Sequence, residues 1–235
     1  TGCSRGVGLE ICRVLLEEGH VVYGVSRSYS NEFRILEEKY ESKLFFKNVD
    51  LSDTTNIHKI IFKEFLTNSV LLDGYVNNAA VAYDDIITNL QIDKLRAMYN
   101  VNVFSPMLLT KYAIRNMLLH HTQGSIIHIS SISVHTGYKG LSMYASSKGA
   151  LEAFSKDTAR EWGQLGIRSN VVVPGFMETA MSSSLTEEQK DRIYKRTSLK
   201  QATDVRSVAE TVAFLLSKKA CSITGQNIFV DNGTI

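Results

Sequence analysis

Short apolar runs rich in β-branched residues alternate along this chain with longer segments of helical period. The runs expected to form strands are Val21–Val25, Leu44–Asn48, Gly74–Val76, Ser125–Ile129, Ser169–Val173 and Gln226–Val230. The segments expected to form helices are Gly8–Glu18, Thr55–Thr67, Ile92–His120, Ser142–Gly163, Thr186–Arg196 and Val205–Ser217. Strands that alternate with helices usually build βαβ units, whose strands pair in parallel. The alternation therefore predicts an α/β fold in three layers, with helices on both faces of a parallel sheet.

Length and composition favour a single domain over residues 1–235, because neither a low-complexity linker nor an internal repeat divides the chain. Charge is nearly balanced, with 26 basic and 24 acidic residues, which gives no support to a nucleic-acid or membrane partner. No apolar run approaches the roughly 20 residues that span a bilayer. The three cysteines lack metal-ligand spacing and suit a reducing compartment. We expect a cytoplasmic protein without a metal site.

A glycine-rich segment opens the sequence, Thr1-Gly2-Cys3-Ser4-Arg5-Gly6-Val7-Gly8. Glycines let a backbone turn tightly and approach a pyrophosphate, whose charge then meets a helix N-terminus. Glycine clusters also make plain turns. Such a loop normally follows a central strand of a doubly wound sheet. We therefore expect that a first strand precedes Thr1 and is missing from the sequence.

Tyr144 and Lys148 lie one helical turn apart in Tyr-Ala-Ser-Ser-Lys, with Ser131 upstream of them. The i,i+4 spacing places both side chains on one helix face, where an ammonium group favours the tyrosinate. A phenol titrates near pH ~10, so we expect Lys148 to lower the pKa of Tyr144 toward neutrality. Taken singly, each residue has an ordinary structural interpretation: Ser131 as a strand-end cap, Tyr144 as a core residue and Lys148 as a surface residue.

Two further motifs lie on either side of these residues: Asn77-Asn78-Ala79-Ala80 precedes Ser131, and the segment from Pro174-Gly175 to Thr179 follows Lys148. Together with the glycine loop and the Tyr-x-x-x-Lys pair, they resemble the short-chain dehydrogenase/reductase family across essentially the whole chain. The resemblance is greatest to 3-oxoacyl-(acyl carrier protein) reductases. It implies a Rossmann-type doubly wound sheet and hydride transfer between a nicotinamide cofactor and a carbonyl or alcohol carbon. One departure is Ala80, where the family usually has glycine.

The resemblance also assigns catalytic roles. Ser131 would hold the substrate carbonyl, Tyr144 would deliver the proton as general acid, and Lys148 would also bind the nicotinamide ribose. The family's fourth member is an asparagine, for which Asn100 and Asn102 are candidates; Asn102 aligns better with the downstream sequence.

Family position assigns a larger set to the cofactor: Gly2, Ser4, Arg5, Gly6, Gly8, Ser26, Arg27, Asp50, Leu51, Asn77, Ala79, Tyr144, Lys148, Pro174, Gly175 and Thr179. At the end of the second strand an acid would bind a ribose 2′-hydroxyl, whereas arginine accommodates a 2′-phosphate. Ser26 occupies the acid's position and Arg27 follows it, so NADP(H) is expected. The alternatives are that the arginines are solvated surface charges, that Asp50 caps a loop and that Thr179 is an ordinary turn residue.

The expected function is NADPH-dependent reduction of a ketone, most simply a 3-oxoacyl thioester of acyl carrier protein or CoA. The alternatives are a sugar, polyol or other secondary-alcohol dehydrogenase and a non-catalytic NADP-binding regulator; the intact catalytic set disfavours the regulator. Phe176 to Arg196 resembles the family's substrate lid, and its basic residues could attract an acidic carrier or simply be solvated. Small residues on the Tyr144 helix, together with the resemblance, suggest a homodimer or homotetramer.

Overall fold

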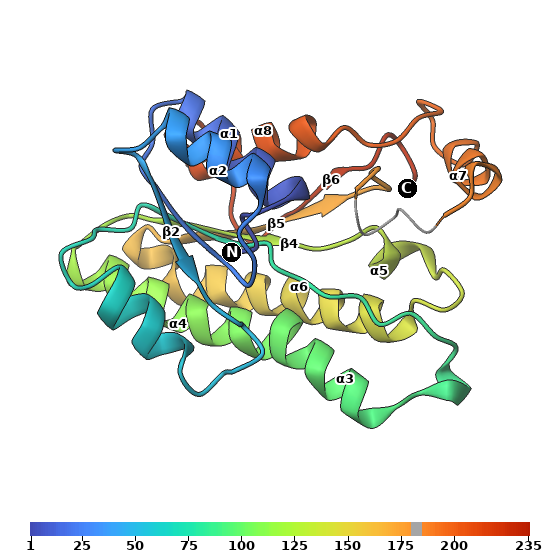
Figure 1. The fold of residues 1–235 in the computed structure, drawn as a ribbon, viewed down its shortest axis with the longest axis horizontal. Coiled ribbons are helices and arrows are strands. Elements are labelled where there is room, and N and C mark those ends of the chain that lie inside the picture. Colours follow the sequence, from blue (N-terminus) through green and yellow to red (C-terminus); the bar gives the residue numbers. More distant parts are fainter. Residues whose placement is uncertain (180–184) are drawn as a thin grey trace.

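The computed structural model describes residues 1–179 and 185–235 (Figure 1). Its strands are β1 (Val22–Ser26), β2 (Leu44–Asn48), β3 (Gly74–Asn77), β4 (Ser125–Ile129), β5 (Arg168–Pro174) and β6 (Asn227–Val230). Each predicted strand is present within one residue at either end, and every pairing between them is parallel. All residues of β4 are buried, as are all of β5 after Arg168, which explains their uninterrupted apolar runs.

The strands form two hydrogen-bonded sheets, one with β1 and β2 and one in the order β3-β4-β5-β6. The first two residues lie between them, because the Thr1 amine donates to Val76 O at 2.9 Å and Gly2 N donates to Val25 O at 2.8 Å. Successive strands proceed outward from this point in both directions. In open α/β folds ligands bind outside the carboxyl ends of the strands at such a switch point. The further strand expected before Thr1 stays a prediction.

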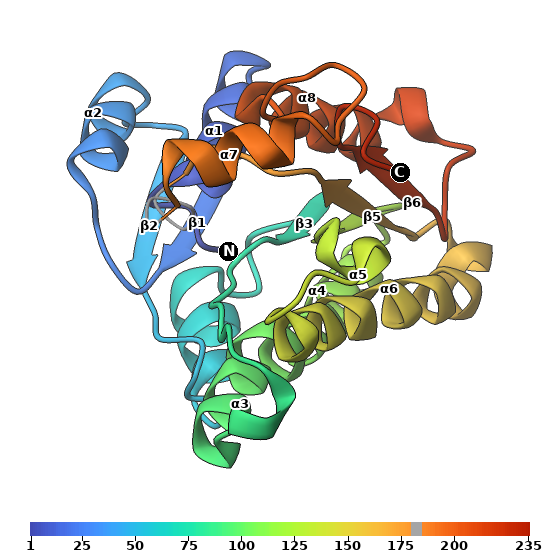
Figure 2. The same cartoon turned by 90° about the vertical axis from the view of Figure 1, so that its right-hand side faces the viewer.

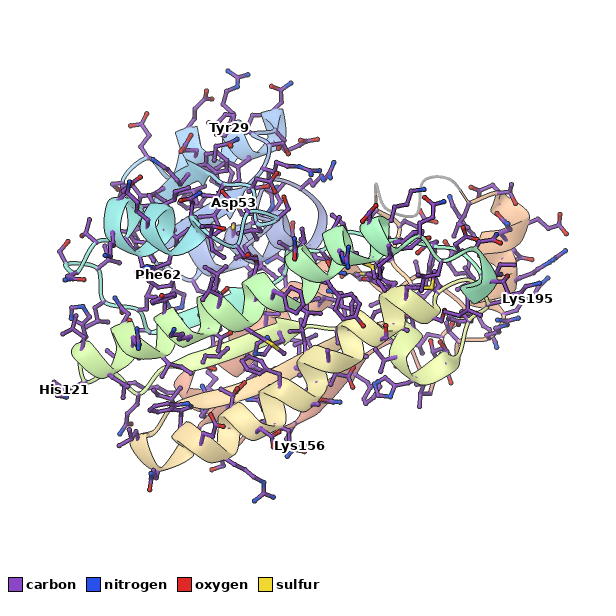
Figure 3. The ribbon with its side chains drawn as sticks, turned by 90° about the horizontal axis from the view of Figure 1, so that it is seen from below. Tyr29, Asp53, Phe62, His121, Lys156 and Lys195 are labelled. Carbon is purple, nitrogen blue, oxygen red and sulfur yellow. The ribbon has the colours of Figure 1, made fainter. Side chains whose placement is uncertain are left out.

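Helices cover both faces of the strands, as predicted. One layer contains α1 (Gly6–Glu17) and α8 (Val205–Leu216); the other contains α4 (Ser105–Leu119) and α6 (Ser142–Trp162) (Figures 1 and 2). On the α1 and α8 side, Ile127 and Val172 pack against Val14 and Val212 with no more than 3% of any of these side chains exposed. The long α4 and α6 are neighbours on the opposite face (Figure 3). The sheet is thus a rigid platform for the residues at its carboxyl edge.

Some helices differ from the sequence-based expectation. The helix α2 (Asn31–Lys39) was not predicted; Ser30 caps it by accepting from Phe33 N at 3.0 Å. The expected helix over 55–67 is π-helical over Lys59–Phe65. The expected helix over 92–120 is α3 (Ile92–Tyr99), a π-helical segment Asn100–Phe104 and α4. Short elements are α5 (Ser133–Thr136) and 3-10 turns at Ile87–Asn89, Gly163–Leu165 and Lys218–Ala220.

Two helix starts agree with the sequence signals. Thr186 and Gln189 form a reciprocal capping box at the start of α7 (Glu187–Tyr194). The carboxylate of Asp204 accepts from the first amides of α8. None of the helices in the described residues is long and apolar enough to cross a membrane. Within those residues, no group of three or more His, Cys, Asp or Glu side chains could hold a metal ion.

Candidate active site

The glycine loop forms a tight cradle at the start of α1. Gly2 has a φ of +66°, a conformation that side chains other than glycine rarely adopt. A Cβ atom at Gly8 would lie 2.1 Å from the Gly2 carbonyl oxygen, so only glycine allows this approach of the two backbones. The cradle leaves the N-terminus of a 12-residue helix facing the switch point. These residues fit the pyrophosphate of a dinucleotide.

Asn78 holds the cradle in place and was missed by the sequence analysis as a site residue. Its amide nitrogen donates to Thr1 O at 2.9 Å and Gly2 O at 3.2 Å, while the backbone amides of Asn78 and Ala79 donate to Thr1 Oγ1. The signal was present in the pair Asn77-Asn78, of which only the first residue was chosen. The loop after β3 therefore positions the cofactor loop.

The side chain of Asn77 points into the protein. It is 2% exposed, and its amide nitrogen lies 3.0 Å from both Thr110 Oγ1 and His128 Nδ1, while its oxygen accepts from Tyr75. Successive side chains of a strand point to opposite faces, and that of Asn77 points to the face covered by α4, which carries Thr110. The geometry does not support a cofactor contact by this side chain; its bonds fix the end of β3 instead.

The end of β1 brings Ser4 and Ser26 together, as the cofactor assignment requires, with their hydroxyl oxygens 2.9 Å apart. Arg5 and Arg27 are exposed beside them, and neither forms an ion pair with any described residue. Two exposed cations that form no ion pair within the described part of the chain, beside two hydroxyls, fit an anionic group such as a 2′-phosphate.

Asp50 and Leu51 follow β2. The Asp50 carboxylate accepts from Ser52 N at 2.9 Å, and this bond lowers the pKa of Asp50. The contact is the one a loop cap makes, which was the alternative interpretation. Leu51 is buried, and its carbonyl accepts from Ser105 of α4. These bonds secure the loop at the edge of the site.

The predicted catalytic residues converge at the carboxyl end of β4. Ser131 follows that strand and hydrogen-bonds to Tyr144, which lies in the first turn of α6. Lys148 is 2% exposed; its ammonium donates to Ile129 O at 2.8 Å and lies 5.8 Å from the centre of the Tyr144 ring. The i,i+4 spacing on α6 thus places Lys148 beside the Tyr144 ring and against the end of β4, the strand that precedes Ser131.

The expected direction of the Tyr144 pKa shift is wrong for the protein's own groups. Burial, with the charge of Asp84 as the second cause, raises the pKa of Tyr144 to about 12, and the hydrogen bond from Ser131 only partly opposes this. Burial also lowers the pKa of Lys148 to about 8. The sequence argument counted the neighbouring cation but not the cost of removing a phenolate from water, which here is larger.

Asn102 lies within the π-helical segment between α3 and α4, a distortion that often marks functional sites. Its side chain pairs with both backbone groups of Val81 at 2.9 Å and donates to Ser147 Oγ at 3.0 Å. The side chain therefore ties the loop after β3 to α6. Both amide hydrogens of Asn102 are used in these bonds, to Val81 O and to Ser147 Oγ.

The segment after β5 closes the other side of the site. Pro174 O accepts from Ile132 N at 2.9 Å, next to Ser131. A Cβ atom at Gly175 would lie 2.5 Å from Thr203 Oγ1, so glycine is required where this turn packs. Thr179 is partly buried. Met181, part of the expected lid, lies outside the described residues.

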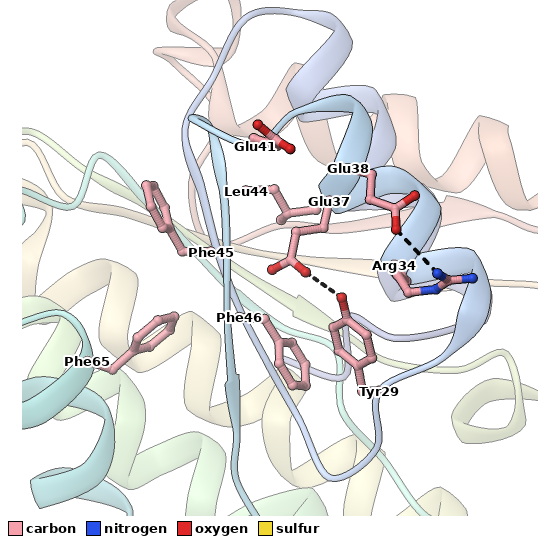
Figure 4. A pocket seen from close by; sticks show the side chains of 9 residues that line it. All are labelled: Tyr29, Arg34, Glu37, Glu38, Glu41, Leu44, Phe45, Phe46 and Phe65. Atoms are coloured by element: carbon pink, nitrogen blue, oxygen red, sulfur yellow. Dashed lines mark hydrogen bonds and ion pairs between the residues drawn. The ribbon is translucent and has the colours of Figure 1, made fainter.

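A surface hollow of about 590 Å³ lies elsewhere, between α2 and β2 (Figure 4). It contains none of the predicted site residues. Two of its carboxylates are already engaged, because Glu37 accepts from Tyr29 and Glu38 pairs with Arg34 at 3.3 Å. We assign no catalytic role to it.

Comparison with known proteins matches residues 2–234 to the family described as enoyl-(acyl carrier protein) reductase. The 3-oxoacyl-(acyl-carrier-protein) reductase FabG of Vibrio cholerae is 32% identical over 235 residues, covering 99% of this chain and 94% of that protein. The corresponding enzyme of Vibrio harveyi is 30% identical over 233 residues, with the same coverage. The chain belongs to the short-chain dehydrogenase/reductase family. Like other members of this family, it is an oxidoreductase that uses a nicotinamide cofactor on alcohol and carbonyl groups.

Solved structures of short-chain dehydrogenases confirm the Rossmann-type fold. A gluconate 5-dehydrogenase from Burkholderia cenocepacia, in complex with NADP and tartrate, superposes with a TM-score of 0.92 at 26% identity, covering 100% of this chain and 92% of its own. A 4-hydroxyisoleucine dehydrogenase complexed with NADH also gives a TM-score of 0.92, at 24% identity, with 99% and 96% covered. Dehydrogenase structures that contain NADP or NADH thus share this fold.

We expect Asp84→Asn to lower the pKa of Tyr144, because it removes a negative charge that disfavours the phenolate. In the alcohol-oxidising direction Tyr144 must accept a proton, so activity rises as pH passes its pKa. The rising limb of log kcat against pH should therefore move to lower pH in the variant. Asp85→Asn is the matched control, since Asp85 binds Ile86 N and Asn89 instead. Equal profiles for wild type and Asp84→Asn would contradict the prediction.

Proposed function

We propose that this protein reduces a ketone to a secondary alcohol with NADPH, and that its substrate is a 3-oxoacyl thioester of acyl carrier protein or CoA. The observation that carries the reaction type is the convergence of Ser131, Tyr144 and Lys148 at the carboxyl end of β4. This strand pairs with β3, and the loop after β3 holds the glycine cradle. A nicotinamide cofactor, when bound, supplies the hydride.

The protein's own residues handle the carbonyl oxygen and the proton. When the ketone binds, Ser131 turns its single hydroxyl hydrogen from Tyr144 to the carbonyl oxygen, on which negative charge develops as the ketone is reduced. Tyr144 delivers the proton. A pKa of about 12 keeps its phenol protonated at neutral pH, and an alkoxide is a stronger base than a phenolate, so the transfer is favourable. The raised pKa therefore suits reduction better than oxidation at neutral pH.

The preference for NADPH is supported by Arg5 and Arg27, which lie beside Ser4 and Ser26 without ion-pair partners among the described residues. A charge-assisted bond to a phosphate oxygen is stronger than a neutral one. The 2′-hydroxyl of NADH would find no carboxylate at Ser26 to bind it. Gly24, two residues before Ser26 on β1, is required by packing and not by the choice of cofactor, because a Cβ atom there would lie 2.7 Å from Cys3 Sγ.

The thioester substrate is supported by similarity to the two Vibrio reductases over nearly the whole chain. The similarity to the gluconate 5-dehydrogenase is the observation that supports the alternative function, a sugar or polyol dehydrogenase. The basic side chains of α7 give little support to carrier attraction: Lys190, Arg192 and Lys195 pair with Glu187, Glu188 and Asp191.

We also propose a cytoplasmic homodimer or homotetramer, because Ala145, Gly149 and Ala153 allow close approach to α6.

The test is a matrix of substrates and cofactors on the purified protein. We expect acetoacetyl-CoA to oxidise NADPH with a kcat/KM at least tenfold above that with NADH. Gluconate, other polyols and simple diketones, assayed in both directions, are the comparison set. Turnover of a polyol without turnover of acetoacetyl-CoA would replace the thioester by the alternative substrate class. An NADH preference would refute the role given to Arg5 and Arg27.

A further inference from the structure

A buried carboxylate, that of Glu152, lies one helical turn beyond Lys148 on α6. Its exposed fraction is 8%, and carboxylates are rarely buried unless they are paired or hydrogen-bonded. None of the chemistry described above uses this residue. Because Glu152 comes four residues after Lys148, it lies on the same face of α6, the face that covers β4 and β5.

Three donors from three different segments converge on this carboxylate. Ser130 donates its hydroxyl to Oε1, and Asn227 of β6 donates to Oε2 at 2.7 Å. The Nε2 atom of His135, on α5, lies 3.1 and 3.0 Å from the two oxygens. The His135 ring also packs edge-on against Phe229 with their centres 4.9 Å apart. Glu152 therefore joins the end of β4, α5 and β6 to α6.

The chain on either side of Ser131 is fixed by these bonds. Lys148 holds the carbonyl of Ile129 and Glu152 holds the hydroxyl of Ser130, the two residues that precede Ser131. Beyond Ser131, Glu152 holds His135, while Ser133 donates to Ser131 Oγ from both its backbone nitrogen and its hydroxyl, at 3.2 and 3.0 Å. Without the carboxylate, the turn that carries Ser131 would lose one side-chain bond on each side, at Ser130 and at His135.

We propose that Glu152 is a positioning residue that holds the Ser131 hydroxyl in reach of Tyr144 by anchoring Ser130 and His135, an inference that rests on the ketone reduction proposed above. Catalytic hydrogen bonds are sensitive to small displacements, and a misplacement of about 1 Å can reduce a rate by about 100-fold. The carboxylate itself does not need to contact the substrate. It acts only through Ser131.

The test is a double-mutant cycle between Glu152→Gln and Ser131→Ala. Glutamine has nearly the same shape as glutamate but has one side-chain oxygen, whereas the donors Ser130, His135 and Asn227 share two oxygens in the wild type. Its NH2 group would also face one of these donors. We expect Glu152→Gln to lower kcat by about 10- to 100-fold, with NADPH affinity and substrate KM within about twofold of wild type. In the Ser131→Ala background the same change should lower kcat less than about twofold, because the residue it positions is gone.

Glu161→Gln is the matched control, since Glu161 is exposed on the same helix. Equal losses from Glu152→Gln in both backgrounds, or no loss in either, would overturn the positioning role. If Glu152→Gln fails to fold, as judged by its melting transition, Glu152→Asp replaces it in the cycle with the same non-additivity expected. A wild-type protein that reduces no ketone of the panel would remove the proposed function and this inference together, whereas additive losses in an active enzyme remove only the inference.

Discussion

Tyr144→Phe is expected to lower kcat for ketone reduction by about 10²- to 10⁴-fold, the range contributed by a well-placed general acid. The substitution removes one oxygen and leaves the ring, which packs with Met143 and Tyr83 in a small apolar cluster. The glycine cradle and the Ser4–Ser26 pair are not in contact with that oxygen, so NADPH affinity should change less than about twofold. Stopped-flow or steady-state NADPH oxidation gives kcat, and NADPH fluorescence gives the affinity.

Tyr99→Phe is the control for this substitution. The Tyr99 hydroxyl lies 2.9 Å from Ser146 Oγ, so it also contacts α6, but this bond is to Ser146 and not to Ser131. We expect that variant to retain turnover within about twofold. Near-normal kcat in Tyr144→Phe would exclude Tyr144 as the proton donor, and loss of NADPH binding would show that the ring has a structural role that the geometry does not indicate.

The sequence predicted the strands better than the helices, for a physical reason. Buried parallel strands must be apolar throughout, so runs such as Ser125–Ile129 are recognisable without knowledge of their neighbours. The helix α2 buries only Phe33 and Leu36, and its third apolar residue, Ile35, is exposed, so few apolar positions mark it in the sequence. The π-helical segment at Asn100–Phe104 depends on the bonds of Asn102 to Val81 and Ser147, which bring together parts of the chain that no local pattern connects.

The site was predictable where spacing alone sets geometry and not where burial decides. The pair Tyr144 and Lys148 required only the helical repeat. The role of Asn77 required knowing that its side chain bonds to Thr110 and His128, which are distant in sequence, and the pKa of Tyr144 required knowing how far the phenol is removed from water. Glu152 gave no signal because its three donors come from residues 22, 17 and 75 positions away in sequence.

Lys148→Met is expected to abolish most turnover and, at neutral pH, to stabilise the fold. Burial lowers the pKa of Lys148 from its ordinary 10.5 to about 8, a difference worth about 3 kcal/mol. Below pH 8 the lysine is charged in both the folded and unfolded states, and the full penalty of burying that charge acts on the folded state. Between 8 and 10.5 the unfolded state binds more protons, so the wild type gains stability as pH rises, and the penalty is gone above 10.5.

Methionine keeps the length and flexibility of the side chain without its charge, and loses only the bond to Ile129 O, worth about 1 kcal/mol. The net gain of about 2 kcal/mol at pH 7 should raise the melting temperature by roughly 5 °C, and this gain should disappear by pH 10.5. Lys156→Met, an exposed position on the same helix (Figure 3), should change the melting temperature little at either pH. A variant less stable than the wild type at pH 7 would mean that the bond to Ile129 outweighs the cost of burying the ammonium. A variant more stable than the wild type at pH 7 would identify Lys148 as a residue retained for catalysis at the expense of stability.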